Sequence, residues 1–269
     1  MLKRKLISLF VFISVMGLCI TTCDNDTTGS GRNVNNTDFM ASESFEYAVG
    51  VVDHTRFSLA AINGTVNITG VPGADSVMIS GEKSVGSESM EDAEDYLQFL
   101  EVTVEDNISG VAVRTEQPAN TYGRSYTVDY NITIPRDFIV VATAVNGLIF
   151  ISTINNNITV QHVNGQISIN EIFGSANVTM VNGQIIGDIT LPPDGMIDML
   201  TVNGDINLIM PQNTSAEFSA IVANGYINVY NLVLHDQVST NTSVSGTLGD
   251  GQGTISLLVT NGGINVAGN

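Results

Sequence analysis

The sequence predicts an all-β protein, a single-stranded right-handed parallel β-helix (a solenoid) with one short helical insertion. Three observations lead to this fold class. Asn-Gly pairs recur at nearly constant spacing, aliphatic residues with a period of two follow them, and only 13% of the 269 residues are charged. A weakly charged chain rich in Val, Ile, Asn, Thr and Gly is typical of strands joined by many turns.

Residues 1–22 are expected to be a lipoprotein signal peptide. The basic cluster Lys3 to Lys5 precedes an apolar run from Leu6 to Ile20, which is shorter than a membrane span of about 20 residues and typical of a signal peptide. The tetrapeptide ITTC resembles the lipobox of bacterial lipoproteins, and this resemblance implies that Cys23 becomes the lipidated N-terminus. The alternative is an ordinary secretory signal with an incidental cysteine.

The next segment, residues 23–44, is expected to be a flexible tether behind the lipidated cysteine. It is polar, rich in Gly, Asn and Thr, and without hydrophobic periodicity, which is the composition of a chain that cannot bury enough apolar surface to fold. The folded β-solenoid domain is therefore expected to span residues 45–269, and its membrane contact to be made through the lipid anchor.

The charge distribution excludes some partners. The formal net charge is −18, which becomes 6 − 27 = −21 without the basic leader, and no Lys or Arg follows Arg136. A nucleic-acid-binding protein places cations against phosphates, so that class is excluded. Adsorption to an anionic lipid surface is disfavoured for the same reason. Both cysteines, Cys19 and Cys23, lie in the leader, so the body has no disulfide.

A helical insertion is expected at about residues 86–101. Apolar residues occur there at helical spacing, and Ser89 followed by Asp92 resembles a capping box. The apolar positions are Met90, Ala93, Leu97 and Leu100. The helix is expected to lie against the solenoid or to cover its end, with the acids between Glu88 and Asp95 forming a solvated face.

Two architectures can explain the recurring Asn-Gly pairs, which begin at residues 63, 146, 164, 182, 203, 224 and 261. Asn-Gly between alternating strands is a strong hairpin signal, so a meander of hairpins is one reading. The other is a parallel β-helix with one coil per repeat, in which Asn and Gly supply the left-handed backbone of a corner. The spacings of 18, 18, 21 and 21 residues favour the solenoid, because stacked coils must keep their length. Right-handed coiling is favoured for parallel connections.

Stacked corners would also explain why Asn recurs and Asp does not, since corner amides can hydrogen-bond along the column. Where Asn-Gly is missing, we expect substitute corners at the ISG of Ile79 to Gly81, at the ISG of Ile108 to Gly110 and at Ser245-Gly246. The aliphatic residues after each corner are expected to point inward and to form the core. They are Ile149, Ile151, Ile167, Ile169, Ile185, Ile206, Leu208, Ile227, Val229, Ile264 and Val266.

The repeat units resemble a family. The run of VNGxIxI units, preceded by VDYNITIPRDFIVVATAVNG and including TVNGDINLIMP, resembles a bacterial family of unknown function named as putative adhesins. The likeness covers roughly residues 45–269. It implies a parallel β-helix exported to the cell envelope, and it brings no catalytic residues.

The sequence contains no recognisable catalytic, cofactor-binding or metal-binding motif. A polysaccharide lyase on this fold needs a base and cations, which the repeat region lacks. A glycoside hydrolase needs two carboxylates about 5 to 9.5 Å apart. The available acids, Asp188 with Asp205 and Asp194 with Asp198, are expected to be turn and rim residues. The three histidines, His54, His162 and His235, are isolated, so we expect structural or surface roles and no metal site. No calcium-binding loop motif occurs.

The candidate binding residues lie on the outer face near the C-terminus. If Ile227 and Val229 point inward, then Tyr226, Asn228 and Tyr230 point outward. The preceding coil is expected to place Asp205 and Asn207 directly beneath Tyr226 and Asn228. An exposed row of aromatic and amide side chains is suited to a glycan or a protein edge, whereas isolated outward tyrosines are also ordinary on β-surfaces.

The function expected from the sequence is that of a non-enzymatic, membrane-anchored envelope lipoprotein, facing the periplasm or the cell exterior, with an adhesin-like binding or scaffolding β-solenoid. Its partner would be an unidentified protein or glycan, without any cofactor. Two alternatives remain open: a carbohydrate-active enzyme such as a glycan hydrolase on a β-helix, and an envelope stress-signalling component.

Overall fold

The computed structural model describes residues 37–52 and 54–269. The expected signal peptide, the lipidation site Cys23 and residues 23–36 of the tether lie outside the described residues. The described part is all-β with one short helix, as predicted. None of its helices is long and apolar enough to cross a membrane.

The first half of the described chain contains seven strands and the helix. They are β1 (Phe39–Gly50), β2 (Arg56–Ala60), β3 (Asn63–Val71), β4 (Ser76–Ser87), α2 (Met90–Leu97), β5 (Glu101–Asn107), β6 (Gly110–Glu116) and β7 (Ser125–Pro135). Strand β1 begins at Phe39 and therefore includes residues that the sequence analysis assigned to the tether. The polar composition of this segment predicts no regular structure, but the segment forms a strand because it pairs with β4 over its whole length.

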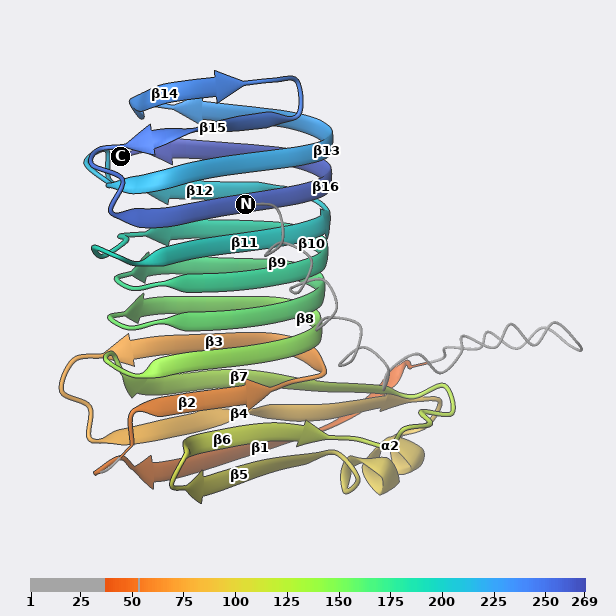
Figure 1. The fold of residues 1–269 in the computed structure, drawn as a ribbon. Coiled ribbons are helices and arrows are strands. Elements are labelled where there is room, and N and C mark those ends of the chain that lie inside the picture. Colours follow the sequence, from red (N-terminus) through yellow and green to blue (C-terminus); the bar gives the residue numbers. More distant parts are fainter. Residues whose placement is uncertain (1–36, 53) are drawn as a thin grey trace, which may run out of the picture. The chain divides into compact units, whose positions relative to one another are not determined.

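The second half forms a stack of long strands. They are β8 (Ile139–Ile154), β9 (Ile158–Ile172), β10 (Ala176–Ile189), β11 (Met196–Asn203), β12 (Ile206–Met210), β13 (Ala216–Tyr230), β14 (Leu234–Ser239), β15 (Ser243–Leu248) and β16 (Gly253–Gly268). We call one pass of the chain around an Asn-Gly pair a rung, the part before the pair its first arm and the part after it its second arm. In stacking order the rungs are β2–β3, β8, β9, β10, β11–β12, β16 and β13 (Figure 1).

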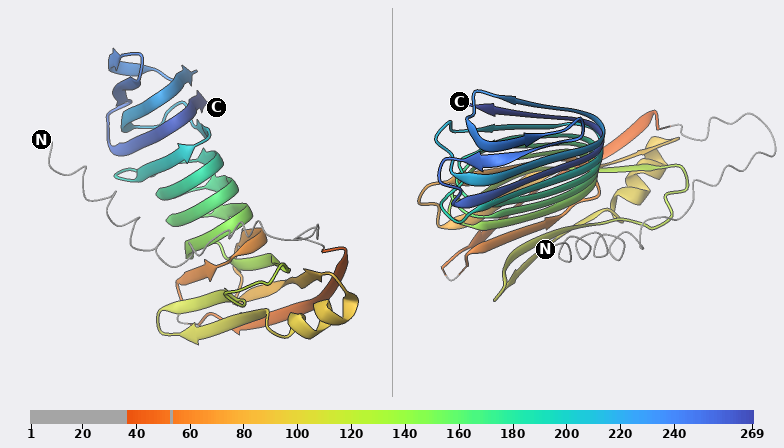
Figure 2. Two further views of the ribbon diagram at one scale, coloured as in Figure 1. Left: turned by 90° about the vertical axis from the view of Figure 1, so that its right-hand side faces the viewer. Right: turned by 45° about the horizontal axis from the view of Figure 1, so that its top comes forward.

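Neighbouring rungs pair in parallel along both arms. Val140 pairs with Ile158 before the corner and Ile149 with Ile167 after it, and the same register continues from β9 to β10. The two arms of each rung diverge from a shared bend, so the rungs enclose a space between them (Figure 2). The meander of hairpins is therefore wrong, because a hairpin turn would make the strands on either side of Asn-Gly antiparallel partners. The right-handed coil direction stays a prediction.

All the Asn-Gly pairs are corners, and their side chains form the predicted column. Each corner asparagine except Asn63 donates its side-chain amide to the side-chain oxygen of the corner asparagine in the rung below, at distances of 2.7 to 2.9 Å. Asn63, at the lower end, donates to the Tyr126 carbonyl oxygen at 2.9 Å. The column, which we call the corner ladder, runs through Asn63, Asn146, Asn164, Asn182, Asn203, Asn261 and Asn224. Aspartate cannot replace a member without loss, since a carboxylate has no amide to donate.

Glycine follows each corner asparagine for a steric reason. Gly165 has a φ of +139°, which side-chain-bearing residues rarely adopt. A Cβ on Gly165 would also overlap the carbonyl oxygen of Gly147 in the rung below. The close approach of successive corners therefore requires glycine twice, once for the backbone angle and once for the space.

The core lies between the two arms and consists of aliphatic columns. The predicted inward residues of β8, β9, β10, β12 and β16 are at most 1% exposed, which confirms them. Ile227 and Val229 of β13 are only half-buried. Burying a Val or Ile side chain fully stabilises the folded state by roughly 1.5 to 3 kcal/mol, so the aliphatic columns together are a large stabilising term.

Antiparallel strands complete the stack at both ends, and three expected corners are wrong for that reason. Gly81 lies within β4, which pairs antiparallel with β1 and β7. Ile108 lies in the turn between the antiparallel strands β5 and β6, and Gly246 lies within β15, which pairs antiparallel with β13. Gly81 and Gly246 each pair with a residue of a neighbouring antiparallel strand, so the presence of Ser-Gly does not by itself mark a corner.

Helix α2 is a smaller element than residues 86–101 and packs on β1 and β4. The Asp92 backbone N–H donates to the Ser89 Oγ at 3.1 Å, which confirms the predicted N-terminal cap. Ala93 is fully buried, whereas Met90 is exposed. The helix thus covers part of the antiparallel end with a short apolar face.

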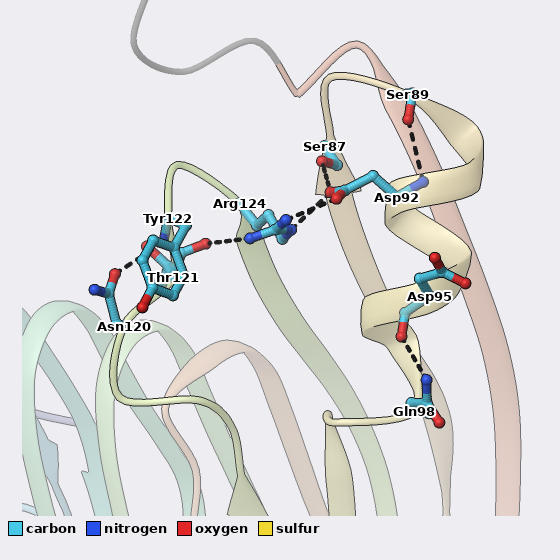
Figure 3. A network of polar contacts seen from close by, with 9 residues as sticks. All are labelled: Ser87, Ser89, Asp92, Asp95, Gln98, Asn120, Thr121, Tyr122 and Arg124. Atoms are coloured by element: carbon cyan, nitrogen blue, oxygen red, sulfur yellow. Dashed lines mark hydrogen bonds and ion pairs between the residues drawn. The ribbon is translucent and has the colours of Figure 1, made fainter.

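One acid of this helix is not part of a solvated face. The Asp92 carboxylate accepts hydrogen bonds from the Arg124 Nε at 2.6 Å and Nη2 at 2.7 Å, and also from the Ser87 hydroxyl (Figure 3). The Arg124 side chain is 13% exposed, and its guanidinium lies 3.4 Å from the Tyr96 ring centroid. The hydrogen bonds from Arg124 and Ser87 lower the pKa of Asp92. This ion pair ties α2 to the segment that leads into β7.

We expect Asn182→Asp to destabilise the protein by about 1 kcal/mol, because the variant cannot donate to the Asn164 oxygen and leaves that acceptor unpaired. The matched control is Gln184→Glu, which makes the same charge change on the same strand outside the corner ladder. Urea unfolding would measure both variants. Equal free energies of unfolding for the two would show that the ladder contributes nothing.

We expect Asp92→Asn to lower the free energy of unfolding at pH 7 by about 1.5 to 3 kcal/mol, the range for hydrogen bonds to charged groups. A lowered native pKa contributes stability above the ordinary aspartate pKa of about 3.9, and this contribution disappears as pH falls through the native pKa. The variant and the native protein should therefore converge in strong acid. Glu94→Gln, on the exposed face of the same helix, should show no such pH dependence. A pH-independent gap for Asp92→Asn would contradict the ion-pair explanation.

Candidate functional site

The candidate site is the outer face of the second arms near the C-terminal end of the stack. Tyr226 and Tyr230 of β13 point outward and are 49% and 53% exposed. Their neighbours Ile227 and Val229 face the core, as the alternation along a strand requires. The outward orientation of the two tyrosines is therefore confirmed.

The expected placement of Asp205 and Asn207 directly beneath Tyr226 and Asn228 is wrong, because β16 lies between β12 and β13. Residues 226 and 228 pair with Gly263 and Asn265 of β16. Asn265 in turn pairs with Asn207 of β12. The five candidate residues thus share one face, but a strand separates Asp205 and Asn207 from Tyr226, Asn228 and Tyr230.

A second column of amides connects the three strands across this face. The Asn228 side-chain amide donates to the Asn265 oxygen at 3.0 Å, and the Asn265 amide donates to the Asn207 oxygen at 2.9 Å. Asp205 accepts a hydrogen bond from the Gly263 backbone N–H at 2.6 Å through one carboxylate oxygen. These contacts hold the polar side chains in fixed positions, so this face presents a pre-organised surface.

Gly263 explains the orientation of Tyr226. A Cβ on this glycine would overlap the Tyr226 ring, whose atoms reach over the neighbouring strand. The ring therefore lies on bare backbone, which leaves part of one ring face exposed to solvent. Half-exposed tyrosines on a rigid sheet suit recognition, since they offer a large contact area and lose little conformational entropy on binding.

A shallow depression lies lower on the same outer face. It is lined by the following residues of three rungs: Asn67, Ile68, Thr69, Phe150, Ile151, Ser152, Ser168 and Asn170. The sequence gives no sign of this depression, because its residues come from β3, β8 and β9, whose outward positions carry no shared motif. The depression arises where the large Phe150 side chain stands beside the small Ser168 side chain of the next rung.

Asp188 and Asp205, one of the two acid pairs considered for a hydrolase, are separated along the strands. Asp188 pairs with Ile209, while Asp205 lies beside the position of Gln184. Four residues along a strand correspond to roughly 13 Å, well beyond the roughly 5 to 9.5 Å of a glycosidase pair. Asp194 lies in a turn with a φ of +59°, and Asp198 lies on the first arm of its rung. Burial raises the pKa of Asp198.

The histidine interior to the stack has a structural role. His162 is 1% exposed, and its ring nitrogens lie 3.1 Å from the Ala144 carbonyl oxygen and 3.0 Å from that of Gly147. The ring thus bonds β9 to the rung below. Within residues 37–52 and 54–269, no three His, Cys, Asp or Glu side chains gather closely enough to hold a metal ion.

Comparison with protein families gives one match for the stack. Residues 131–267 match the model of a family described as Toastrack DUF4097. The matched region begins in β7 and ends within β16, so it contains the parallel rungs from β8 onward and the candidate tyrosines. Among curated proteins there is no match.

Three solved structures are similar to this chain at low sequence identity. A putative cell adhesion protein from Clostridium sporogenes ATCC 15579 is 11% identical, with 85% of this chain and 100% of that one covered and a TM-score of 0.47. A putative adhesin from Bacteroides fragilis NCTC 9343 is 11% identical, with 84% and 97% covered and a TM-score of 0.30. A putative adhesin from Parabacteroides merdae ATCC 43184 is 10% identical, with 86% and 98% covered and a TM-score of 0.22.

Proposed function

The chain belongs to the Toastrack DUF4097 family, and we propose that this member is a non-enzymatic, lipid-anchored envelope protein with an adhesin-like binding or scaffolding role. The binding element is a right-handed β-solenoid whose outer second-arm face contacts a protein or a glycan. A solenoid presents long, flat ladders of side chains, which suit extended partners.

The observation that carries this proposal is the pair of half-exposed tyrosines on a rigid support. Tyr226 and Tyr230 lie on the same face of β13, two positions apart, with Asn228 between them held by the Asn265 side chain. Aromatic anchors and nearby amides that are already fixed keep the entropy cost of binding low. The same combination serves the planar face of a sugar ring and the side chains of a protein edge.

The separation of the acids favours binding over hydrolysis. Asp188 and Asp205 are too far apart to act as acid and base on one glycosidic bond, and Asp205 is already bonded to the Gly263 backbone. The acid best suited by its raised pKa to hold a proton, Asp198, lies on the first arm, away from the tyrosines.

The envelope location rests on the N-terminal sequence. Lipidation of Cys23 would anchor the chain, because two or more acyl chains on one residue give stable membrane attachment. The polar segment after Cys23 would then stand the solenoid off the bilayer, facing the periplasm or the cell exterior.

We expect the double variant Tyr226→Ala, Tyr230→Ala to bind, at least tenfold more weakly, a glycan or envelope protein that the native chain binds. The reason is that both exposed anchors are removed without disturbing the core. A panel of acidic and neutral glycans presented to the full chain would identify the ligand, and new reducing or unsaturated ends would be assayed in parallel. Tyr122→Ala is the matched control, since Tyr122 is 75% exposed but lies in the loop before β7.

If the double variant binds every ligand of the native chain with unchanged affinity, the tyrosine face is not the binding site. New sugar ends formed by the native chain would instead favour the hydrolase alternative.

We expect Cys23→Ala to move the protein from the membrane fraction to the soluble fraction and to abolish labelling by a fatty-acid analogue, because the acylated residue is lost. Cys19→Ala should leave both properties unchanged. A native protein that takes up no fatty-acid label and is recovered in the soluble fraction would rule out this anchor and favour an ordinary secretory signal.

A further inference from the structure

Four strand edges are free of a neighbouring strand in the described part of the chain, and three of them carry features that discourage pairing. Strand β1 contains Glu43 and Glu46, and β5 contains Glu101, Glu105 and Asp106. Strand β14 has an irregular register between His235 and Val238 and contains Asp236 with a φ of +50°. Charges and bulges are the usual means by which proteins protect exposed edges.

The fourth edge carries no such protection. The second arm of β13, Asn224 to Tyr230, pairs with β16 on one side, whereas β15 pairs only with residues 216–221 of the first arm. This second-arm edge has no charged residue, no proline and no bulge. It is therefore a regular row of backbone donors and acceptors with one side unpaired.

Core packing beside this edge is also incomplete. Ile227 and Val229 are half-buried, whereas the equivalent residues Ile264 and Val266 of the rung below are fully buried. The side-chain oxygens of Asn224 and Asn228 end their two amide columns, and no described residue donates to them. The last rung thus presents two partly exposed aliphatic side chains and two amide acceptors, which one more strand would satisfy.

We propose that the second-arm edge of β13 binds an extended, net basic segment of another protein by β-strand addition. The segment would continue the second-arm sheet, with aliphatic residues at alternate positions over Ile227 and Val229 and amide or hydroxyl residues between them. Main-chain hydrogen bonds give such interactions their affinity, and the alternate side chains give specificity.

The basic character of the partner follows from charge. Between Asp137 and Asn269 the chain has nine Asp and Glu residues and no Lys or Arg. The edge is itself uncharged, so the acidic surroundings attract a segment whose cations flank an apolar centre. An acidic segment of the same pattern would be repelled.

A second copy of the chain fits this edge poorly. Strands β15 and β14 stand above β13 on the first arm, as Figure 1 shows at the top of the stack, so two β13 edges brought together would collide there. The only free strand that a second copy could offer from this end is β14, which is irregular and carries Asp236. A second copy is also as acidic as the first.

The experiment uses the full chain and a labelled peptide, Lys-Lys-Val-Asn-Ile-Thr-Val-Lys-Lys. We expect it to bind, and a peptide with proline in place of the central Ile to bind at least tenfold more weakly, because proline interrupts the strand. Replacing the lysines by glutamates should weaken binding to a similar extent. Amide hydrogen exchange should slow at Ile227 to Tyr230 when the peptide is bound.

Val229→Lys should abolish binding by placing a charge at the inner side of the edge, while Ile209→Lys, which adds the same charge at an exposed position of β12, should not. The proposal is overturned if the proline peptide binds as tightly as the original peptide, or if the glutamate peptide binds as tightly as the lysine peptide. It is equally overturned if the slower amide exchange appears on β1, β5 or β14. It is also overturned if the native chain dimerises and Val229→Lys makes it monomeric. The double variant Tyr226→Ala, Tyr230→Ala distinguishes this edge from the proposed outer face. It leaves the backbone edge intact, so it should still bind the peptide.

Discussion

The structure depends on the register of successive corners. Each Asn-Gly pair must lie directly over the next, because the asparagine donates to its neighbour and the glycine leaves room for the neighbour's carbonyl oxygen. A shift of one residue would lose the amide bond and would also turn the inward aliphatic residues outward. The polar column and the apolar core thus enforce the same register, and this agreement fixes how each rung lies on the next.

The same constraint explains how the stack ends. A parallel rung leaves an unpaired edge at each end, and the chain covers these edges with antiparallel strands and, at the N-terminal end, with α2. At the C-terminal end, β15 pairs with the first arm of β13, whereas the second arm of β13 pairs only with β16. The exposed tyrosines and the free edge both belong to this last strand, so both proposed binding surfaces lie on the rung that has no further rung to pair with.

Sequence reasoning was reliable where one residue's role is repeated. The corners, the inward Ile and Val residues and the outward orientation of Tyr226 follow from spacing and alternation alone. It was unreliable where two distant segments meet. Arg124 contacts Asp92 across the antiparallel end of the fold, and the sequence between them shows no pattern that pairs them. From the sequence alone, Asp92 is therefore indistinguishable from the exposed acids near it. Only the folded arrangement of the strands between the two residues reveals its ion pair with Arg124.

The period of the sequence by itself determined which residues turn the corner and which face the core, because both properties are local to one rung. The tertiary structure alone decided the order of the rungs. Strand β16 enters between β12 and β13 rather than following β13, since any strand with the same corner and alternation can pair with either neighbour. That choice separates Asp205 from Tyr226 and leaves the second arm of β13 as the last strand of its sheet.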